Sequence, residues 1–276
     1  MDKTVLQKTA VEIRKGILTS VHSAKAGHPG GSLSAADLLT YLYFEKMNID
    51  PKDPKKSDRD RFVLSKGHAA PALYSTLAHR GYFPVETLTT LRQIGSILQG
   101  HPDMKHIPGV DMSSGSLGQG ISAAVGIALA GKLSDQNYKT YALLGDGEIQ
   151  EGQVWEAAML AAHQHLNNLV LIVDNNNLQI DGAIDEVNSP YPIDKKFEAF
   201  NFFVIPVEDG NDFSQLEAAF NKADTVTDQP VAIIMKTVKG KGVSFMENQA
   251  SWHGTAPNDE QYALAMEELT KAGEQL

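Results

Sequence analysis

The sequence predicts an α/β fold in which a central parallel sheet carries helices on both faces. Several short segments are apolar throughout, as strands buried on both faces are. Segments with helical periodicity separate them along the chain. No internal repeat and no linker rich in Pro, Gly or Ser divides the 276 residues. We therefore expect a single domain over residues 1–276.

The chain begins with two predicted helices. Apolar residues recur at helical spacing over residues 4–25, which predicts an amphipathic helix. The segment Gly27–Gly31, which contains one Pro and three Gly, then interrupts the helical pattern. Either Ser32 or Ser34 is expected to cap a second helix, which extends to about Lys46.

Strands and helices alternate over the rest of the chain. Strands are expected at residues 61–65, 140–144, 169–173, 202–207 and 231–238, and helices at 69–80, 120–131, 151–165, 213–223 and 259–272. Right-handed crossovers join such strands, and ligands bind at the carboxyl ends of the strands. The carboxyl ends are therefore where chemistry is expected.

Charge and composition exclude several functions. The 24 Lys and Arg residues against 34 Asp and Glu give a net charge of −10, and the basic residues form no block. We expect no binding to nucleic acid or to an anionic membrane. Zero cysteine excludes a disulfide framework and a thiolate site. The amino terminus lacks an apolar signal segment and the aliphatic runs are too short to span a membrane, so a cytoplasmic location is expected.

Two polar segments follow neighbouring apolar strands. Gly145-Asp146-Gly147 ends one strand, and Asp174-Asn175-Asn176-Asn177-Leu178 ends the next, with a helix between them. Carboxylate, amide and backbone carbonyl oxygens suit Mg²⁺ or Ca²⁺. The glycines let the backbone approach a phosphate, and the following helix directs its positive end at it. Each segment alone is typical of a turn, but the pair predicts a metal-bridged diphosphate.

A dinucleotide site is disfavoured at the same place. The Gly-x-Gly-x-x-Gly pattern of such sites would need a third glycine where Gln150 stands.

Four histidines lie beside glycines in predicted loops. They are His28, His68, His101 and His253. A histidine in such a loop faces a cleft, where it can donate hydrogen bonds to oxyanions or move protons. Each one singly is typical of a solvated turn, whereas the set indicates an active site.

Two further loops are of interest. Residues 114–120 form a small-residue loop that leads into a helix and could approach a ligand closely. Lys236, Lys239 and Lys241 follow a strand, where we expect a solvated loop rather than a phosphate site.

These motifs resemble one family. The segment from Gly145 to Asn176 resembles the thiamine-diphosphate-binding motif, which begins with Gly-Asp-Gly and ends with two asparagines. Residues 151–157, the four histidine loops and residues 115–120 resemble transketolase in particular. The resemblance covers essentially the whole chain, but only the amino-terminal third to half of a typical transketolase. It implies the diphosphate-domain fold of thiamine-diphosphate enzymes.

The resemblance also implies a cofactor site. Thiamine diphosphate would be bound with Mg²⁺ (or Ca²⁺), and the metal ligands would be Asp146, Asn176 and the carbonyl of Leu178. Residues in contact with the cofactor would be His68, Gly115, Leu117, Asp146, Gly147, Asn176, Ile180 and His253, with Gly115 and Leu117 touching the aminopyrimidine ring.

Catalytic roles follow from the same resemblance. His28, His101 and His253 would contact the hydroxyls of the donor sugar and assist proton transfer, while His68 and His253 would contact the diphosphate. Glu151 matches the glutamate that links two cofactor sites across a subunit interface.

The implied reaction transfers a two-carbon glycolaldehyde unit from a ketose (phosphate) to an aldose (phosphate), as in pentose phosphate metabolism. No segment matches the pyrimidine-binding or carboxy-terminal domains. We therefore expect the amino-terminal subunit of a split transketolase. It would pair with a carboxy-terminal subunit, and two such heterodimers would associate.

Three alternatives remain at this point. The chain could belong to another thiamine-diphosphate enzyme, either like 1-deoxy-xylulose-5-phosphate synthase or of the E1 dehydrogenase type. It could be a non-catalytic thiamine-diphosphate-binding protein. A metal-dependent nucleotide-binding protein is the third alternative.

Overall fold

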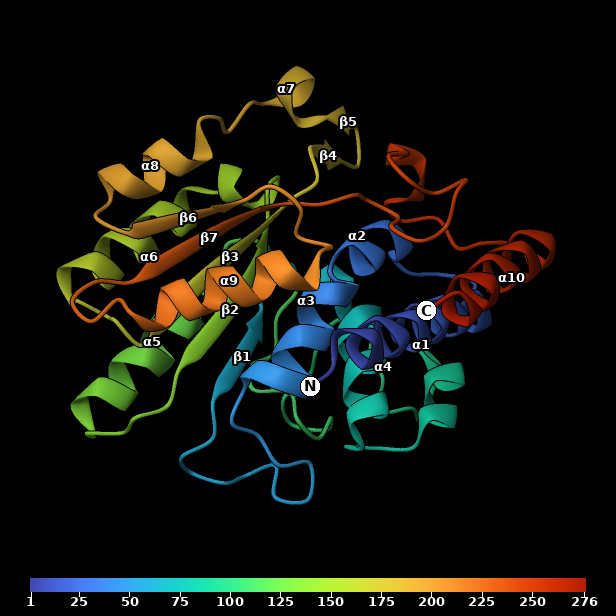
Figure 1. Cartoon of the computed structure of the whole chain (residues 1–276), viewed down its shortest axis with the longest axis horizontal. Helices are drawn as coiled ribbons and strands as arrows, with labels where there is room; N and C mark the ends of the chain where they lie inside the picture. Colours follow the sequence, from blue (N-terminus) through green and yellow to red (C-terminus); the bar gives the residue numbers. More distant parts are fainter.

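A parallel sheet lies between two layers of helices (Figure 1). The structure is a computed structural model that describes residues 1–276. Its strands are β1 (Arg61–Leu64), β2 (Thr140–Gly145), β3 (Leu169–Asn175), β6 (Phe203–Val207) and β7 (Val231–Lys236). They lie in the order β1-β2-β3-β7-β6, and every neighbouring pair is parallel. The predicted α/β class is confirmed.

The helices agree closely with the predicted ranges. They are α1 (Lys3–Ala24), α2 (Pro29–Ser34), α3 (Ala36–Tyr41), α4 (Ala70–Arg80), α5 (Gln119–Leu133), α6 (Gly152–His163), α7 (Ile184–Val187), α8 (Ile193–Ala199), α9 (Phe213–Asp224) and α10 (Asp259–Glu274). The short helices α7 and α8, and a small hairpin of β4 (Leu178–Gln179) and β5 (Gly182–Ala183), were not expected from the sequence.

Both faces of the sheet are buried, which explains why its strands are apolar throughout. Phe62, Tyr141 and alternating residues along the other strands pack against α1, α3, α4 and α9. Val63, Ala142 and their equivalents pack against α5, α6 and α8 on the opposite face. Successive strand residues point to opposite faces, so each strand contributes to both cores.

The predicted start of the second helix was wrong. The helix begins at Pro29, because proline suits the first helical position, where no amide partner is needed. Ser32 lies inside the helix and donates to the carbonyl of His28 at 2.7 Å. Ser34 is the last residue of α2 and donates to the Asp174 carboxylate at 2.6 Å. The helical path continues through α3 and a π-helical turn that ends at Lys46, as expected.

Close packing accounts for the glycines in this unexpected helical turn. A Cβ atom on Gly30 would lie 2.9 Å from the carbonyl oxygen of Trp252. Glycine therefore lets α2 approach the segment that precedes His253.

The carboxyl ends of four strands meet at one edge of the sheet. The residues just beyond them are Lys66 after β1, Asp146 after β2, Asn176 after β3 and Lys239 after β7. This edge is where parallel α/β sheets bind ligands. None of the helices combines the length and apolar character needed to cross a bilayer.

Candidate functional site

A cavity of about 350 Å³ opens at the carboxyl edge of the sheet. All of the predicted site residues line it except His101: they are His28, His68, Gly115, Leu117, Asp146, Gly147, Glu151, Asn176, Leu178, Ile180 and His253. They come from separate stretches of the chain. The topology therefore gathers the predicted residues around one volume.

The two turns after β2 and β3 are joined directly. The backbone amide of Asn177 donates to Asp146 Oδ2 at 2.6 Å, and the amide of Gly147 donates to Asp146 Oδ1 at 2.9 Å. Because β2 and β3 are paired in parallel, with Gly145 opposite Asp174, the turns that follow them are neighbours. The carboxylate is thus held beside the Asn176–Leu178 turn.

The oxygen donors at this point suit a hard divalent cation. Asp146 supplies one carboxylate, and Asn176 and Leu178 supply a side-chain amide and a backbone carbonyl. A carboxylate or carbonyl oxygen has more than one acceptor site, so the hydrogen bonds already made do not exhaust these oxygens. Few protein ligands of this kind suit Mg²⁺, which completes its octahedron with phosphate oxygens and water.

The Asp146 carboxyl is itself in need of a counter-charge. It is 3% exposed. Burial, together with the negative charge of Asp174, raises the pKa of Asp146 to about 7. A bound cation would favour the ionised form, so the electrostatics of the site fit a metal ion.

Three of the four predicted histidines form a triangle at the cavity. The ring centroids of His28, His68 and His253 lie 5.1 to 5.5 Å from one another. Burial lowers the pKa of His28 to about 4 and that of His253 to about 3, and lowers the pKa of His68 as well. The buried Nδ1 of His28 has no hydrogen-bond partner. Neutral rings with free polar atoms are suited to donate to an anionic ligand.

Lys239 is part of this cluster, and its predicted place in a solvated loop was wrong. It is 2% exposed and lines the cavity. Its Nζ donates to the carbonyl of Leu178 and to Nδ1 of His253, both at 2.9 Å. An ammonium group can only donate, so His253 accepts at Nδ1 and carries its proton on Nε2. Lys236 and Lys241, in contrast, pair with surface glutamates.

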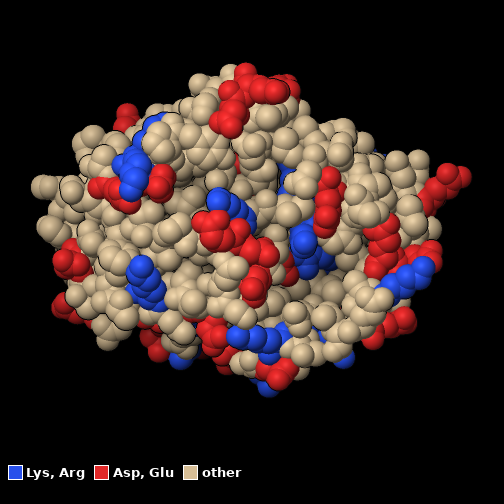
Figure 2. Space-filling view, turned by 45° about the horizontal axis from the view of Figure 1, so that its top comes forward, with Lys and Arg blue, Asp and Glu red and all other residues tan.

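Two buried lysines, Lys66 and Lys239, line the cavity. Burial is the main cause that lowers the pKa of Lys239, to about 8, followed by the nearby charge of Lys66. On the face shown in Figure 2, acidic side chains are spread widely and basic ones lie among them. An anion that entered the cavity would relieve the repulsion between these two cations.

Lys66 and Asp174 form a buried ion pair beneath the cavity, which the sequence did not reveal. They are 1% and 0% exposed. Lys66 Nζ donates to Asp174 Oδ2, and Ser34 and Thr237 donate to the same carboxylate. The pair fastens the ends of β1, β3 and β7 and the helix α2 to one another. These contacts hold the turn that bears Asn176 in place.

The loop at residues 114–120 forms another wall of the cavity. Gly118 has φ +80°, and a Cβ there would lie 2.9 Å from Cβ of Glu151. A glycine is therefore required where this loop meets the start of α6. Leu117 is 36% exposed and Ile180 is 65% exposed, so apolar side chains border the cavity.

His101 is not among the residues that line the cavity, although its exposed side chain lies beside Gly115, which is one of them. A Cβ on Gly115, which has φ +149°, would lie 3.0 Å from the His101 ring. The His101 ring thus packs against the loop, and its pKa is lowered by partial burial and by Arg92.

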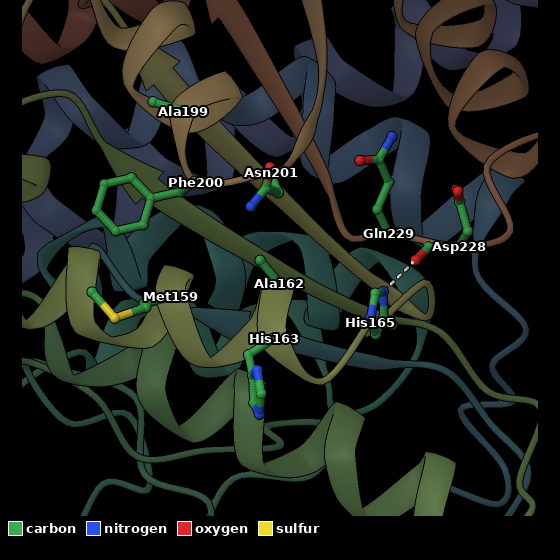
Figure 3. A pocket seen from close by; sticks show the side chains of 9 residues that line it. All are labelled: Met159, Ala162, His163, His165, Ala199, Phe200, Asn201, Asp228 and Gln229. Carbon is green, nitrogen blue, oxygen red and sulfur yellow. Dashed lines mark hydrogen bonds between the residues drawn. The ribbon is translucent and has the colours of Figure 1, made fainter.

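A larger hollow of about 640 Å³ lies at the opposite, amino-terminal edge of the sheet (Figure 3). His165, Asn201 and Gln229 line it just before β3, β6 and β7. His165 bonds the backbone carbonyl of Asp228, which the dashed line in Figure 3 marks. Its polar groups do not converge on a common point, so we place the site at the carboxyl edge.

Comparison with known proteins gives the family. A family model described as "Transketolase, thiamine diphosphate binding domain" matches residues 5–273. The chain belongs to this family. The match covers nearly the whole chain, as the resemblance in its motifs implied, and the residues around the cavity lie within it.

Two curated relatives are transketolase subunits of similar length. The 6-deoxy-6-sulfo-D-fructose transketolase subunit of Clostridium sp. (strain MSTE9) is 44% identical, and the alignment covers 97% of both chains. An apulose-4-phosphate transketolase subunit of Phocaeicola vulgatus is 42% identical over 100% of this chain and 98% of that one.

Other relatives are longer single chains. The structure of transketolase from Campylobacter jejuni superposes with a TM-score of 0.91 at 35% identity, covering 98% of this chain and 43% of that one. Human transketolase is 43% identical over 90% of this chain and 39% of its own length. The chain thus spans less than half of these full-length transketolases, while it matches the separate subunits from end to end.

Proposed function

We propose that this chain is the diphosphate-binding subunit of a two-chain transketolase, which transfers a two-carbon unit from a ketose to an aldose. The chain as a whole, residues 1–276, would form the single diphosphate-binding domain. Mg²⁺ and thiamine diphosphate would be bound at the carboxyl edge of the sheet. The observation that carries the proposal is the Asp146–Asn177 junction facing three histidines and Lys239 across one cavity.

The site residues of this chain would have two roles, which are to hold the cofactor with its cation and to face the sugar. Asp146, Asn176 and the Leu178 carbonyl would hold the cation, while His68, His253 and Lys239 would donate to diphosphate oxygens. His28 lines the cavity and would face the donor sugar, together with His101, whose ring lies beside Gly115. Bound thiamine diphosphate supplies a nucleophilic carbon and an electron sink for the two-carbon unit.

His253 is positioned to act as a donor in this scheme. Lys239 occupies its Nδ1, so its Nε2–H is directed elsewhere and can serve a phosphate or hydroxyl oxygen. Its lowered pKa keeps the ring neutral at pH 7, so it can give a hydrogen bond without adding charge.

A partner subunit is part of the proposal. The two curated relatives of similar length are named as subunits, and the full-length transketolases carry more than half of their residues beyond the matched region. The groups that activate the cofactor and hold the acceptor would come from that partner. Glu151, exposed at the start of α6, is available for contact with it, and a pair of heterodimers in the cytoplasm is the assembly that we propose.

For the sugar substrates we propose only a chemical class. One relative is named for 6-deoxy-6-sulfo-D-fructose and the other for apulose 4-phosphate, so related subunits serve different anionic ketoses. We propose an anionic ketose as the donor.

The test is a reconstitution. The chain is combined with a candidate carboxy-terminal subunit, Mg²⁺ and thiamine diphosphate, and two-carbon transfer is measured from a panel of ketose phosphates to aldoses. We expect transfer by the mixture and none by either chain alone. Turnover by this chain alone would contradict the split-subunit proposal, and pyruvate decarboxylation without ketose transfer would favour an E1-type enzyme.

A further inference from the structure

Glu148 is a buried carboxylate at the cavity to which the proposed function gives no role. It is 2% exposed and begins the short 3₁₀ turn Glu148–Gln150, directly after Gly147. Its side chain is one of those that line the cavity. Burying a carboxylate is costly unless hydrogen bonds satisfy its oxygens.

Both oxygens of Glu148 are satisfied, by three different parts of the site. Oε1 accepts from the hydroxyl of Ser65 and from the backbone amide of Gly118 at 3.0 Å. Oε2 accepts from the backbone amide of Gly145 at 3.1 Å. The Ser65 hydroxyl in turn accepts from the amide of Ile121 at 3.1 Å.

These donors lie on two segments that border the cavity. Gly118 and Ile121 belong to the 114–120 loop and the first turn of α5, and Gly145 opens the turn that bears Asp146. The two segments are already in close contact around Ser65, because a Cβ on Gly120 would lie 2.6 Å from Cα of Ser65. One carboxylate therefore fastens the loop to the turn.

We propose that Glu148 is a positioning residue, which fixes the spacing between the diphosphate end and the aminopyrimidine end of the cofactor site. This inference rests on the proposed function, which places the diphosphate at Asp146, and on the implication of the family resemblance that the aminopyrimidine ring touches Gly115 and Leu117. A ligand that reaches both ends needs them at a set separation. A ligand that occupies the diphosphate end alone does not.

The substitution Glu148→Gln removes one hydrogen-bond acceptor at this position and changes the shape of the side chain little. A glutamine has one acceptor oxygen and one NH₂ group, which can only donate. In either orientation the NH₂ group faces a backbone N–H, at Gly118 or at Gly145. One of these two backbone donors therefore loses its acceptor, which weakens the tie between the loop and the turn.

The experiment compares two probes by calorimetry on the full chain, with its partner subunit where this is required for cofactor binding. The probes are thiamine diphosphate and inorganic pyrophosphate, each with Mg²⁺. We expect Glu148→Gln to weaken thiamine diphosphate binding by about tenfold or more and pyrophosphate binding by less than about twofold. Glu86→Gln, at an exposed glutamate whose side chain bonds nothing, is the matched control.

Ser65→Ala is the second, milder variant. It keeps the carboxylate but removes the hydroxyl that links Glu148 to Ile121. We expect the same selective loss for thiamine diphosphate, smaller in size, and a double variant that loses less than the sum of the two. This variant decides the question if Glu148→Gln melts below the assay temperature.

The outcomes separate the two proposals. Unchanged binding of thiamine diphosphate, or equal weakening of both probes, would overturn the positioning role while leaving the proposed function intact. If the unmodified protein bound neither probe, the proposed function would fail, and the inference would fail with it.

Discussion

The backbone amide of Asn177 donates a hydrogen bond of 2.6 Å to the carboxylate of Asp146, which lies 31 residues earlier in the chain. This single contact joins the turns after β2 and β3. It places a carboxylate, an amide side chain and a backbone carbonyl at one point on the sheet edge. The proposed metal and diphosphate site depends on this junction.

Asp146→Asn is predicted to remove Mg²⁺-dependent binding of thiamine diphosphate. The substitution keeps the size of the side chain but removes the only carboxylate among the proposed ligands. We expect affinity to fall by about 100-fold or more, measured by calorimetry with and without Mg²⁺.

Asp135→Asn is the control for this variant, because Asp135 is exposed and its side chain bonds nothing. It removes the same charge and should leave binding unchanged. An Asp146→Asn variant with the affinity of the unmodified chain would show that the cation lies elsewhere.

The stability of the metal-free chain should depend on the protonation of Asp146. Its pKa is raised from 3.8 to about 7 by burial and by Asp174. The folded state therefore holds a proton that the unfolded state has lost between about pH 4 and pH 7, so this group reduces stability as the pH rises through that window. The free energy of unfolding should fall by at most ~4 kcal/mol, because the two pKa values differ by about three units.

Chemical denaturation of the metal-free chain and of Asp146→Asn measures this effect. Asparagine does not titrate, so the stability of the unmodified chain relative to the variant should decline from pH 4 to pH 7. A constant difference across that range would mean that the carboxyl is not perturbed.

Anion binding at pH 8 should be accompanied by proton uptake at Lys239. Burial and the charge of Lys66 lower the pKa of Lys239 to about 8, so about half of the Lys239 side chains are protonated at that pH when no anion is bound. A diphosphate would raise the pKa again, and uptake of about half a proton is expected. His28 and His253, whose pKa values are about 4 and 3, stay neutral throughout.

Calorimetry of pyrophosphate binding in buffers with different ionisation enthalpies measures this uptake. Lys239→Arg supplies the comparison, since a guanidinium remains charged at pH 8. The variant should bind with no uptake. Equal uptake by both proteins would assign the proton to another group.

Gly118→Ala is predicted to disturb the 114–120 loop. The position has φ +80°, and the added Cβ would lie 2.9 Å from Cβ of Glu151. We expect a loss of stability of about 1–2 kcal/mol from the backbone conformation, with weaker binding of thiamine diphosphate.

Gly126→Ala is the matched change within α5. A Cβ there meets no atom within 4 Å, and alanine is the better helix former by about 1 kcal/mol. This variant should melt at the same temperature or higher. If the two substitutions had the same effect, the loop would tolerate a side chain and the strain argument would be wrong.

Periodicity and turn chemistry predicted most of the fold. Strands such as the one at residues 169–173 could be predicted because both of their faces are buried, which leaves only apolar residues in the pattern. The start of α2 could not, because Gly30 and Pro29 are typical of loops. Only the close approach of Trp252 explains why glycine occurs in that helical turn.

The candidate site was predicted where local motifs carry it, at Asp146, Asn176 and the histidines. Lys66, Lys239, Glu148 and Asp174 were not, since nothing in the sequence distinguishes a buried charged residue from a solvated one. Their burial depends on partners far away in the chain, such as Leu178 for Lys239 and Ser34 for Asp174. His101 matched a local motif as well, and its ring packs beside Gly115 of the 114–120 loop.

A crystal structure of the chain with Mg²⁺ and thiamine diphosphate tests the central claim most directly. We predict one cation bound by Asp146 Oδ, Asn176 Oδ1 and the Leu178 carbonyl at about 2.0–2.1 Å, which bridges the diphosphate next to His68 and His253. A diphosphate bound elsewhere, or a cation that does not contact Asp146 and Asn176 together, would contradict the account.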